Sequence, residues 1–414
     1  MNLTSIIAFI LVFGIIVAVH ELGHLIAAKK FGAVVYQYAI GFGPKIFGWV
    51  KNGTSYAIRI IPVGGYVLIA GSSTDEGVDS LREGQQVKLS IDENLVSTID
   101  ASESPAKADQ TVIRIKNVDL DQLKISGLDA NEELLSFSIS PNADIVLEDG
   151  QSLRIAPPEK QLRNLAQWKQ IIINLAGPLM NFVLAIVLFF ALAFAAPSVP
   201  NNSSQIGTLT KNYPAQKAGL KSGDVIEKLN DRKVKTWAQV SSYLATYDKK
   251  QIKVQYKRAN VVDTKTITLK KSEGRYFLGI TQSNDTDLKS RISYSYQSFI
   301  NASTSIWLAL GNLIVHPNIN DLGGPVAIAK VTSQATQGGF WSVVSLTAFL
   351  SINIGIFNLI PLPVFDGGHI LINIIQAIRR KPLSDKTNTI IQAIGAGIVI
   401  VLLVAVTIND VMRK

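Results

Sequence analysis

The sequence predicts a polytopic α-helical membrane protein. We expect four transmembrane helices, a membrane-associated β-hairpin, a cytosolic β-rich insertion and one extracytoplasmic α+β domain. Three observations lead to this fold class. The 414 residues are 47% hydrophobic, with a mean hydropathy of +0.25, which is high for a soluble protein. The apolar residues gather in runs of about 20, the length that crosses a bilayer as a helix. Polar segments rich in β-branched residues separate these runs.

The four apolar runs are residues 4–28, 171–196, 341–360 and 388–409. They divide the chain into a first span (1–30), a membrane-associated hairpin region (31–74), an acidic β-rich insertion (75–160), a second span (165–197), an α+β domain (205–284), an amphipathic helix and turn outside the membrane (290–338), a third span (339–362), a cytosolic loop (363–387) and a fourth span (388–410).

The charge distribution indicates membrane orientation. Residues 75–160 hold 18 acidic and 8 basic side chains, whereas the whole chain has a net charge of +9. The excess of positive charge flanks apolar runs or lies in 205–290, which argues against nucleic-acid binding. Basic clusters at Lys29–Lys30, Arg163–Lys169 and 379–386 are expected in the cytosol. Both termini and the α+β domain then lie outside a bacterial plasma membrane.

The first apolar run carries His20-Glu21-Leu22-Gly23-His24. Residues four apart lie on one face of a helix, so both imidazole rings can bind one metal ion. Glu21 can then reach a water on that ion. The chain has no cysteine, so a zinc site has to use His, Asp or Glu. Ionisable groups in a membrane are costly unless they have partners, which disfavours a chance match.

Residues 31–72 contain many β-branched and aromatic residues, interrupted by Gly and Pro. Tyr56–Ile61 and Tyr66–Ala70 are expected to form a hairpin that packs against the helices near the metal, because open strands cannot face lipid. A purely structural hairpin is one interpretation. The other is an edge strand, including Gly64, Gly65 and Tyr66, that pairs with an unwound substrate peptide.

The second run contains Asn174, Gly177-Pro178 and Asn181. Small residues and a proline favour helix packing with a kink. Alternatively, one of the two asparagines lines a catalytic cavity and donates hydrogen bonds there. The sequence does not decide between these interpretations, which are compatible with each other.

Segment 205–284 predicts a compact α+β domain. Its stretch PAQKAGLKSGDVI, followed by alternating strands and the turn FLGI with Gly279, resembles a bacterial PDZ domain in the permuted order. The resemblance implies that the domain adds a peptide strand to a sheet edge or holds a C-terminal carboxylate. Residues 292–315 then predict an amphipathic helix on the outer membrane surface, which leaves His316 distant from His20.

The third run ends in the sequence Asn358-Leu-Ile-Pro361-Leu-Pro363-Val-Phe-Asp366-Gly-Gly-His369. The prolines break the helix beside an ionisable residue. Two neutral imidazoles leave both charges of Zn²⁺ uncompensated, so an anionic third ligand is favoured. We therefore prefer Asp366 over His369 as that ligand. Helix N-capping is the alternative role for Asp366.

Together, HELGH, the Gly-Gly-Tyr-Val stretch, the PDZ-like segment and NLIPLPVFDGGH resemble the site-2 protease family of intramembrane zinc metalloproteases. The likeness is greatest to the bacterial regulator-of-sigma-factor proteases of the RseP type, in the Gram-positive-like form with one PDZ domain. It covers nearly the whole chain. The resemblance implies a Zn²⁺-dependent endopeptidase whose substrates are membrane-spanning segments of trimmed anti-sigma factors or signal-peptide remnants.

The resemblance also implies roles for single residues. The metal ligands match His20, His24 and Asp366, the catalytic residue matches Glu21, and substrate-positioning residues match Asn358, Pro361 and Pro363. The PDZ domain is expected to meet the outer part or the C-terminus of a substrate. One rival function is a membrane-anchored PDZ binding module with a non-catalytic metal site, which leaves Glu21 unexplained. A metal transporter is a second rival, disfavoured because no inverted repeat is visible.

Overall fold

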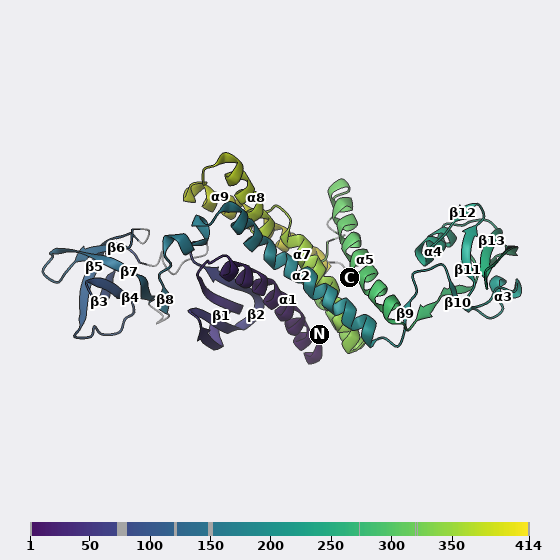
Figure 1. Cartoon of the computed structure of the whole chain (residues 1–414), viewed down its shortest axis with the longest axis horizontal. Helices are drawn as coiled ribbons and strands as arrows, with labels where there is room; N and C mark the ends of the chain where they lie inside the picture. Colours follow the sequence, from purple (N-terminus) through teal and green to yellow (C-terminus); the bar gives the residue numbers. More distant parts are fainter. Residues whose placement is uncertain are drawn as a thin grey trace. The chain divides into compact units, whose positions relative to one another are not determined.

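The computed structural model describes residues 2–72, 81–119, 122–147, 152–272, 274–318, 320 and 322–412 (Figure 1). The chain forms two compact units. Unit 1 contains residues 1–184 and 312–414, and unit 2 contains residues 185–311. The predicted insertion boundary at residue 75 lies outside the described residues.

Among the residues that the structure describes, five helices are long and apolar enough to cross a membrane. They are α1 (Leu3–Lys30), α2 (Gln167–Ala195), α5 (Leu288–Val315), α7 (Phe340–Asn358) and α9 (Asp385–Met412). The sequence analysis predicts only four spans, and α5 is the additional candidate. Its mean hydropathy of 1.3 is the lowest of the five, whereas the others range from 1.8 to 2.6. Two shorter helices, α6 (Pro325–Gln337) and α8 (Asp366–Arg379), lie on either side of α7 in the chain.

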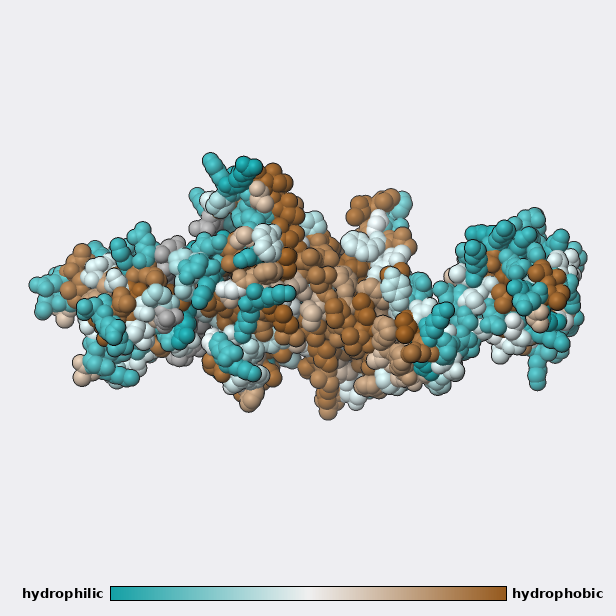
Figure 2. Space-filling view, viewed as in Figure 1, coloured by the Kyte–Doolittle hydropathy of each residue, from teal (hydrophilic) through white to brown (hydrophobic). Residues whose placement is uncertain are grey.

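Hydrophobic residues cover the exposed surface of the long helices of unit 1, as expected for side chains that face lipid (Figure 2). The interior of this bundle is formed by close helix packing. Val12 and Ile16 of α1 are buried against Leu350 of α7. Ser351 of α7 donates a hydrogen bond of 2.8 Å to the backbone oxygen of Asn181 in α2. Helix α7 therefore contacts both α1 and α2 directly.

Helix α6 forms hydrogen bonds with the ends of two long helices, α9 and α1. The carboxylate of Asp410, near the end of α9, accepts hydrogen bonds from the backbone N–H groups of Gly324 and Ala327 at 2.9 and 3.0 Å. These N–H groups lie at the start of α6, where backbone N–H groups have no acceptor within the helix. Near the start of α1, Ser5 lies 3.2 Å from Ser333 of α6. Asp410 thus acts as an N-terminal cap supplied by another helix.

Two long strands, β1 (Val35–Lys51) and β2 (Thr54–Ile69), follow α1 and pair along their whole length. Residues 37–40 pair with residues 65–68 on one side and with residues 55–58 on the other. The predicted hairpin between Tyr56–Ile61 and Tyr66–Ala70 is therefore wrong. The two segments belong to one bent strand, and both pair with β1 because the chain folds back over residues 42–51. In the described part of the chain, the outer edge of residues 65–68 has no strand beside it.

The predicted acidic insertion forms a small closed sheet in the strand order β4-β3-β5-β6-β7-β8. The parallel pairing of β4 with β7 closes this sheet around a core that includes Leu89, Ile99 and Ile145. The bounds are β3 (Gln86–Asp92), β4 (Leu95–Asp100), β5 (Gln110–Asp119), β6 (Lys124–Leu128), β7 (Leu134–Val146) and β8 (Ser152–Arg154), and two single 3₁₀ turns, Pro158–Lys160 and Leu162–Asn164, lead into α2.

Unit 2 contains the predicted α+β domain and most of helix α5. Its main sheet has the order β12-β11-β13-β14 and packs against α4 around Ile226, Val240 and Tyr256. The elements are β9 (Val199–Pro200), β10 (Ile206–Leu209), α3 (Pro214–Lys217), β11 (Val225–Leu229), β12 (Arg232–Lys233), α4 (Trp237–Ala245), β13 (Gln251–Arg258), β14 (Val261–Thr268), β15 (Lys270–Ser272), β16 (Arg275–Phe277), β17 (Ile280–Gln282) and β18 (Asn284–Asp285).

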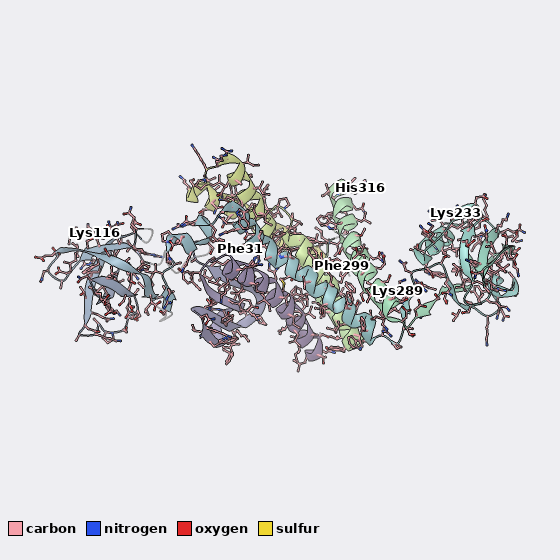
Figure 3. All side chains as sticks on the ribbon, in the orientation of Figure 1. Phe31, Lys116, Lys233, Lys289, Phe299 and His316 are labelled. Carbon is pink, nitrogen blue, oxygen red and sulfur yellow. The ribbon has the colours of Figure 1, made fainter. Side chains whose placement is uncertain are left out.

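Arg291 fixes the start of α5 to the end of α2. Its guanidinium donates hydrogen bonds to the backbone oxygens of Ala193, Phe194, Ala196 and Pro197. The last carbonyls of a helix have no partners within it, so the arginine caps α2. Figure 3 shows His316 at the opposite end of α5 from Lys289.

Candidate metal centre

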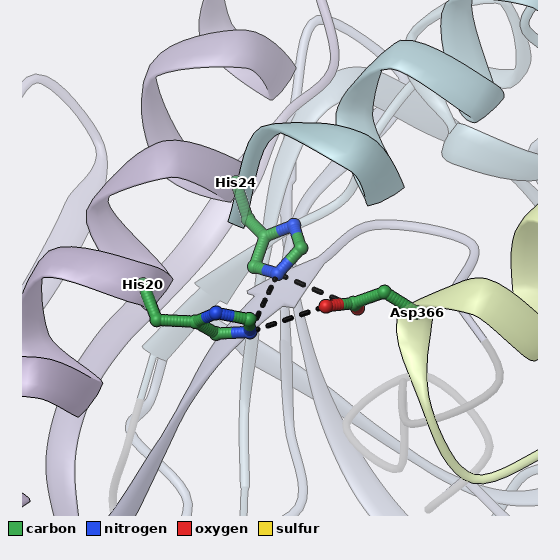
Figure 4. A group of neighbouring side chains, drawn as sticks. All are labelled: His20, His24 and Asp366. Atoms are coloured by element: carbon green, nitrogen blue, oxygen red, sulfur yellow. Dashed lines mark hydrogen bonds and ion pairs between the residues drawn. The ribbon is translucent and has the colours of Figure 1, made fainter. Parts of the chain in front are cut away.

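Three side chains from distant parts of the chain converge inside unit 1 (Figure 4). His20 and His24 lie one turn apart on α1, and Asp366 is the first residue of α8. Nε2 of His20 lies 3.2 Å from Oδ2 of Asp366 and 3.3 Å from Nε2 of His24, and the latter lies 3.5 Å from Oδ1 of Asp366. Both histidines are 8% exposed. One turn of α1 and the first residue of α8 therefore position three potential ligands in a buried site.

The spacing of these atoms suits one small metal ion. Ligands at the usual Zn–N distance on a tetrahedron are separated by about 3.3 Å, close to the separations found here. The three side chains form the one group of this kind among the described residues, with all ligand atoms within 4.8 Å of one another. Oδ2 of Asp366 is buried and has no hydrogen bond of good geometry. The donor set of two imidazoles and one carboxylate therefore fits Zn²⁺ and leaves a fourth position for water.

Asp366 does not act as an N-cap. The cap position of α8 is Phe365, and no side-chain cap hydrogen bond is formed there. The carboxylate instead points to the two imidazole rings, as Figure 4 shows. His369 is half-buried and lies outside the group of converging atoms, as does the exposed His316.

Helix α2 supplies the outer partners of both imidazoles. Nδ1 of His24 lies 2.8 Å from the backbone oxygen of Ile173. A carbonyl only accepts hydrogen bonds, so Nδ1 carries a proton, and in the neutral ring Nε2 presents a lone pair to the site. Nδ1 of His20 lies 3.2 Å from the side-chain nitrogen of Asn181, which is fully buried. Second contacts of this kind orient metal-binding imidazoles.

Gly177 forms one wall of the site with bare backbone. A Cβ atom at this position would lie 2.6 Å from Cε1 of His24 and 2.9 Å from Cε1 of His20, and it would overlap Nε2 of His24. Such contacts are too short for real atoms. A side chain here would therefore displace either the rings or a bound ion, and this requirement explains the glycine before Pro178.

Glu21 is half-buried and lies between the site and the edge of β2. Its Cγ would be 3.4 Å from a Cβ placed on Gly65, and the backbone N–H of Val67 lies within hydrogen-bond reach of its carboxylate. Tyr38 of β1 donates a hydrogen bond of 2.7 Å to the backbone oxygen of Ala18 in α1. The sheet is thus fixed against the helix turn that carries Glu21.

The other predicted substrate-binding residues lie close to these elements in the chain. Gly64 has a φ of +87° and packs against Phe42, and the hydroxyl of Tyr66 donates a hydrogen bond of 2.9 Å to the side chain of Gln37. Asn358 is the last residue of α7, and Pro361 and Pro363 lie in the connection from α7 to Asp366.

The sequence analysis does not identify Gly177 as part of the site, and it leaves the role of Asn181 open. The signal that was available is the presence of two asparagines and a Gly-Pro pair in an apolar run. Which of them faces the histidines depends on how α2 is rotated against α1, and the sequence of α2 alone does not determine that rotation.

Comparisons with known proteins agree over nearly the full length. The family model of Peptidase family M50 matches residues 8–402. A protein of Lactococcus lactis subsp. lactis named "Putative zinc metalloprotease" is 40% identical over 99% of this chain and 98% of its own length. "Probable protease eep" of Enterococcus faecalis is 37% identical over 99% of both chains.

One solved structure, the PDZ domain of the SdrC-like protein from Listeria monocytogenes, is 21% identical over 20% of this chain and 90% of its own, with a TM-score of 0.18. A likeness at this score carries no weight for the fold. The family match and the full-length relatives do, and they agree with the buried group of two histidines and one aspartate. The chain belongs to Peptidase family M50, the intramembrane zinc metalloproteases of the site-2 protease type.

Proposed function

We propose that the chain cleaves membrane-spanning segments with one Zn²⁺ held by His20, His24 and Asp366, and with Glu21 as the general base. The observation that carries this proposal is the convergence of the three ligand atoms, at 3.2–3.5 Å from one another, in a buried site. When bound, Zn²⁺ polarises a water molecule and the scissile carbonyl. One carboxylate oxygen of Glu21 accepts a proton from the water and then donates it to the leaving nitrogen.

We propose that the substrate binds as an extended strand beside residues 65–68 of β2. A membrane-spanning helix hides its amides in its own hydrogen bonds, so it has to unwind before its carbonyl carbon can be attacked. The outer edge of residues 65–68 has no strand beside it in the described residues, and Gly65 lies against Glu21. A peptide paired at this edge would bring its backbone to the catalytic carboxylate. In this proposal Asn358, Pro361 and Pro363 border the same space.

We propose that the active site faces the cytosolic side and that both termini and the 205–284 domain lie outside the cell. Lys29 and Lys30 at the end of α1 support this orientation. We further propose that the 205–284 domain is a PDZ domain that meets the outer part or the C-terminus of a substrate. The substrates are then proteins already trimmed outside the membrane, such as anti-sigma factors or signal-peptide remnants.

The test uses the purified full-length protein and a model substrate with one membrane span and a short outer segment. Glu21→Gln should bind as much zinc as the parent, but its cleavage rate should fall by about 10²- to 10⁴-fold, the usual contribution of a general base. Glu159→Gln, at an exposed glutamate before α2, is the matched control and should cleave normally.

A chelator should abolish cleavage by the parent, and added zinc should restore it. Normal cleavage by Glu21→Gln would refute the role of Glu21. Zinc binding without any cleavage of trimmed substrates would favour the rival function, a membrane-anchored binding module with a non-catalytic metal site.

A further inference from the structure

The two candidate imidazole ligands have different outer partners, and the difference concerns the side chain of Asn181. His24 faces the backbone oxygen of Ile173, which accepts hydrogen bonds only. His20 faces a side-chain amide, which has both a donor and an acceptor end. The tautomer of His24 is therefore fixed by its partner, whereas that of His20 depends on which end of the amide faces the ring.

The hydrogen-bond donors and acceptors around His20 match one another when no metal is bound. The nitrogen of the Asn181 amide lies 3.2 Å from Nδ1 of His20, so Nδ1 accepts a hydrogen bond and the ring proton is on Nε2. That proton is donated to Nε2 of His24 at 3.3 Å, while Oδ2 of Asp366 lies 3.2 Å from Nε2 of His20 without a hydrogen bond. The neutral ring of His24 offers a lone pair at Nε2, so His20 supplies the donor between the two rings.

Zinc binding requires the opposite tautomer. A neutral imidazole bound through Nε2 carries its proton on Nδ1, and this N–H needs an acceptor. The nitrogen end of an amide cannot accept, so Asn181 has to present its oxygen. In the structure this oxygen is buried and has no hydrogen-bond partner, and the residue is 0% exposed. An end-for-end turn of the amide exchanges the two ends while it keeps the shape of the side chain.

Building on the proposed zinc site, we propose that Asn181 is a positioning residue whose amide turns when the metal binds. Without zinc its nitrogen donates to Nδ1 of His20. With zinc its oxygen accepts from Nδ1–H. One proton leaves Nε2 and one arrives at Nδ1 through solvent, so the charge of the ring does not change. The backbone of Asn181 stays in place during this turn, since its oxygen accepts the hydrogen bond from Ser351.

The first experiment measures zinc affinity by competition with a coloured chelator. Asn181→Leu has a similar volume and no polar atom, and it should weaken zinc binding about 10- to 100-fold, the usual effect of losing such a partner. Asn181→Asp keeps an acceptor and should bind zinc within a few-fold of the parent. Asn174→Leu, at the other asparagine of α2, is the matched control and should not change the affinity.

A second experiment observes the tautomer directly and does not depend on any variant. The chain has only four histidines, so ¹⁵N-histidine labelling gives a simple spectrum, in which His20→Gln identifies the signals of His20. At pH 8 the metal-free protein should show His20 protonated at Nε2. The zinc-bound protein should show it protonated at Nδ1.

Unchanged zinc affinity in Asn181→Leu, equal losses in the Leu and Asp variants, or the same His20 tautomer in both states would each overturn the proposal. A parent protein that binds no zinc would instead overturn the proposed function itself, so the two failures are distinguishable.

Discussion

The replacement Gly177→Ala tests the candidate metal centre with a single methyl group. The added carbon would lie 2.6 Å from Cε1 of His24, whereas ordinary contacts are 3.4–4 Å. The ring would have to retreat by about 1 Å, and metal–ligand distances tolerate only about 0.2 Å. Changes to outer partners already cost about 10- to 100-fold in affinity, so displacement of a ligand should cost at least ~100-fold.

The assay is zinc binding to the purified full-length protein by competition with a chelator. Gly14→Ala is the matched control. It is also a helical glycine of this membrane bundle, but a Cβ there would have nothing within 4 Å. This control should bind zinc as the parent does and cleave normally. Parent-like zinc affinity in Gly177→Ala would mean that the ion is held elsewhere, which would refute the reasoning from the ring positions.

Two further predictions concern single carboxylates. Asp366→Ala should lower zinc content strongly while His369→Ala should leave it near the parent value, and the reverse result by elemental analysis would make His369 the ligand. In unit 2, burial by itself raises the pKa of Asp224. Hydrogen bonds from Arg258 at 2.6 and 2.7 Å have the opposite and larger effect, so the pKa lies below its ordinary value. The folded pKa lies below the unfolded value of about 4, so the carboxylate stabilises the domain above that pH and loses its effect as the pH falls. Asp224→Asn should therefore destabilise the domain at pH 7 by about 1–3 kcal/mol, the cost of a buried polar group that loses its partner, and less below pH 4; hydrogen exchange of β11 and β13 measures this, and equal exchange in both proteins at pH 7 would contradict it.

The part of the site that lies within one helix is predictable from the sequence. His20, Glu21 and His24 are related by the helical repeat, so their common face does not depend on the rest of the fold. Asp366 is far away in the sequence, and a charge argument and the family resemblance connect it with the histidines. Gly177 and Asn181 are different. Their contacts depend on the rotation of α2 against α1, for which a continuous apolar run gives no signal.

The membrane-associated sheet shows the same limit for strands. Local propensity correctly suggests extended structure around Tyr56 and Tyr66, because both segments are β-branched and aromatic. It also suggests that segments separated by Pro62-Val63-Gly64-Gly65 form a hairpin. The observed partner of both segments is β1, which precedes them in the chain. The closure of the acidic domain by β4 and β7 is likewise a long-range pairing that no local pattern encodes.

The candidate metal centre limits how often the chain can cross the membrane between α2 and α7. Grouping His20 and His24, near the end of α1, with Asp366, just after α7, requires α1 and α7 to run in the same direction across the membrane. The end of α2 and the start of α7 must therefore lie on the same side of the membrane, which is the outer side in the proposed orientation. Two contacts agree with this: Arg291 caps the end of α2, and Asp410, near the end of α9, caps α6. Because both flanks of α5 lie on the outer side, we expect α5 not to cross the bilayer, although its length and composition would permit it.

Cysteine labelling tests this topology directly, since the chain has no cysteine of its own. His316→Cys places one exposed thiol after α5, and a membrane-impermeant maleimide should label it in intact cells. Lys233→Cys, in the domain expected outside, should also react, whereas Lys381→Cys, in the loop expected in the cytosol, should react only after permeabilisation. If α5 crossed the membrane, His316→Cys would behave like Lys381→Cys. Asp366 would then reach the opposite face from His20, and no single ion could bind both.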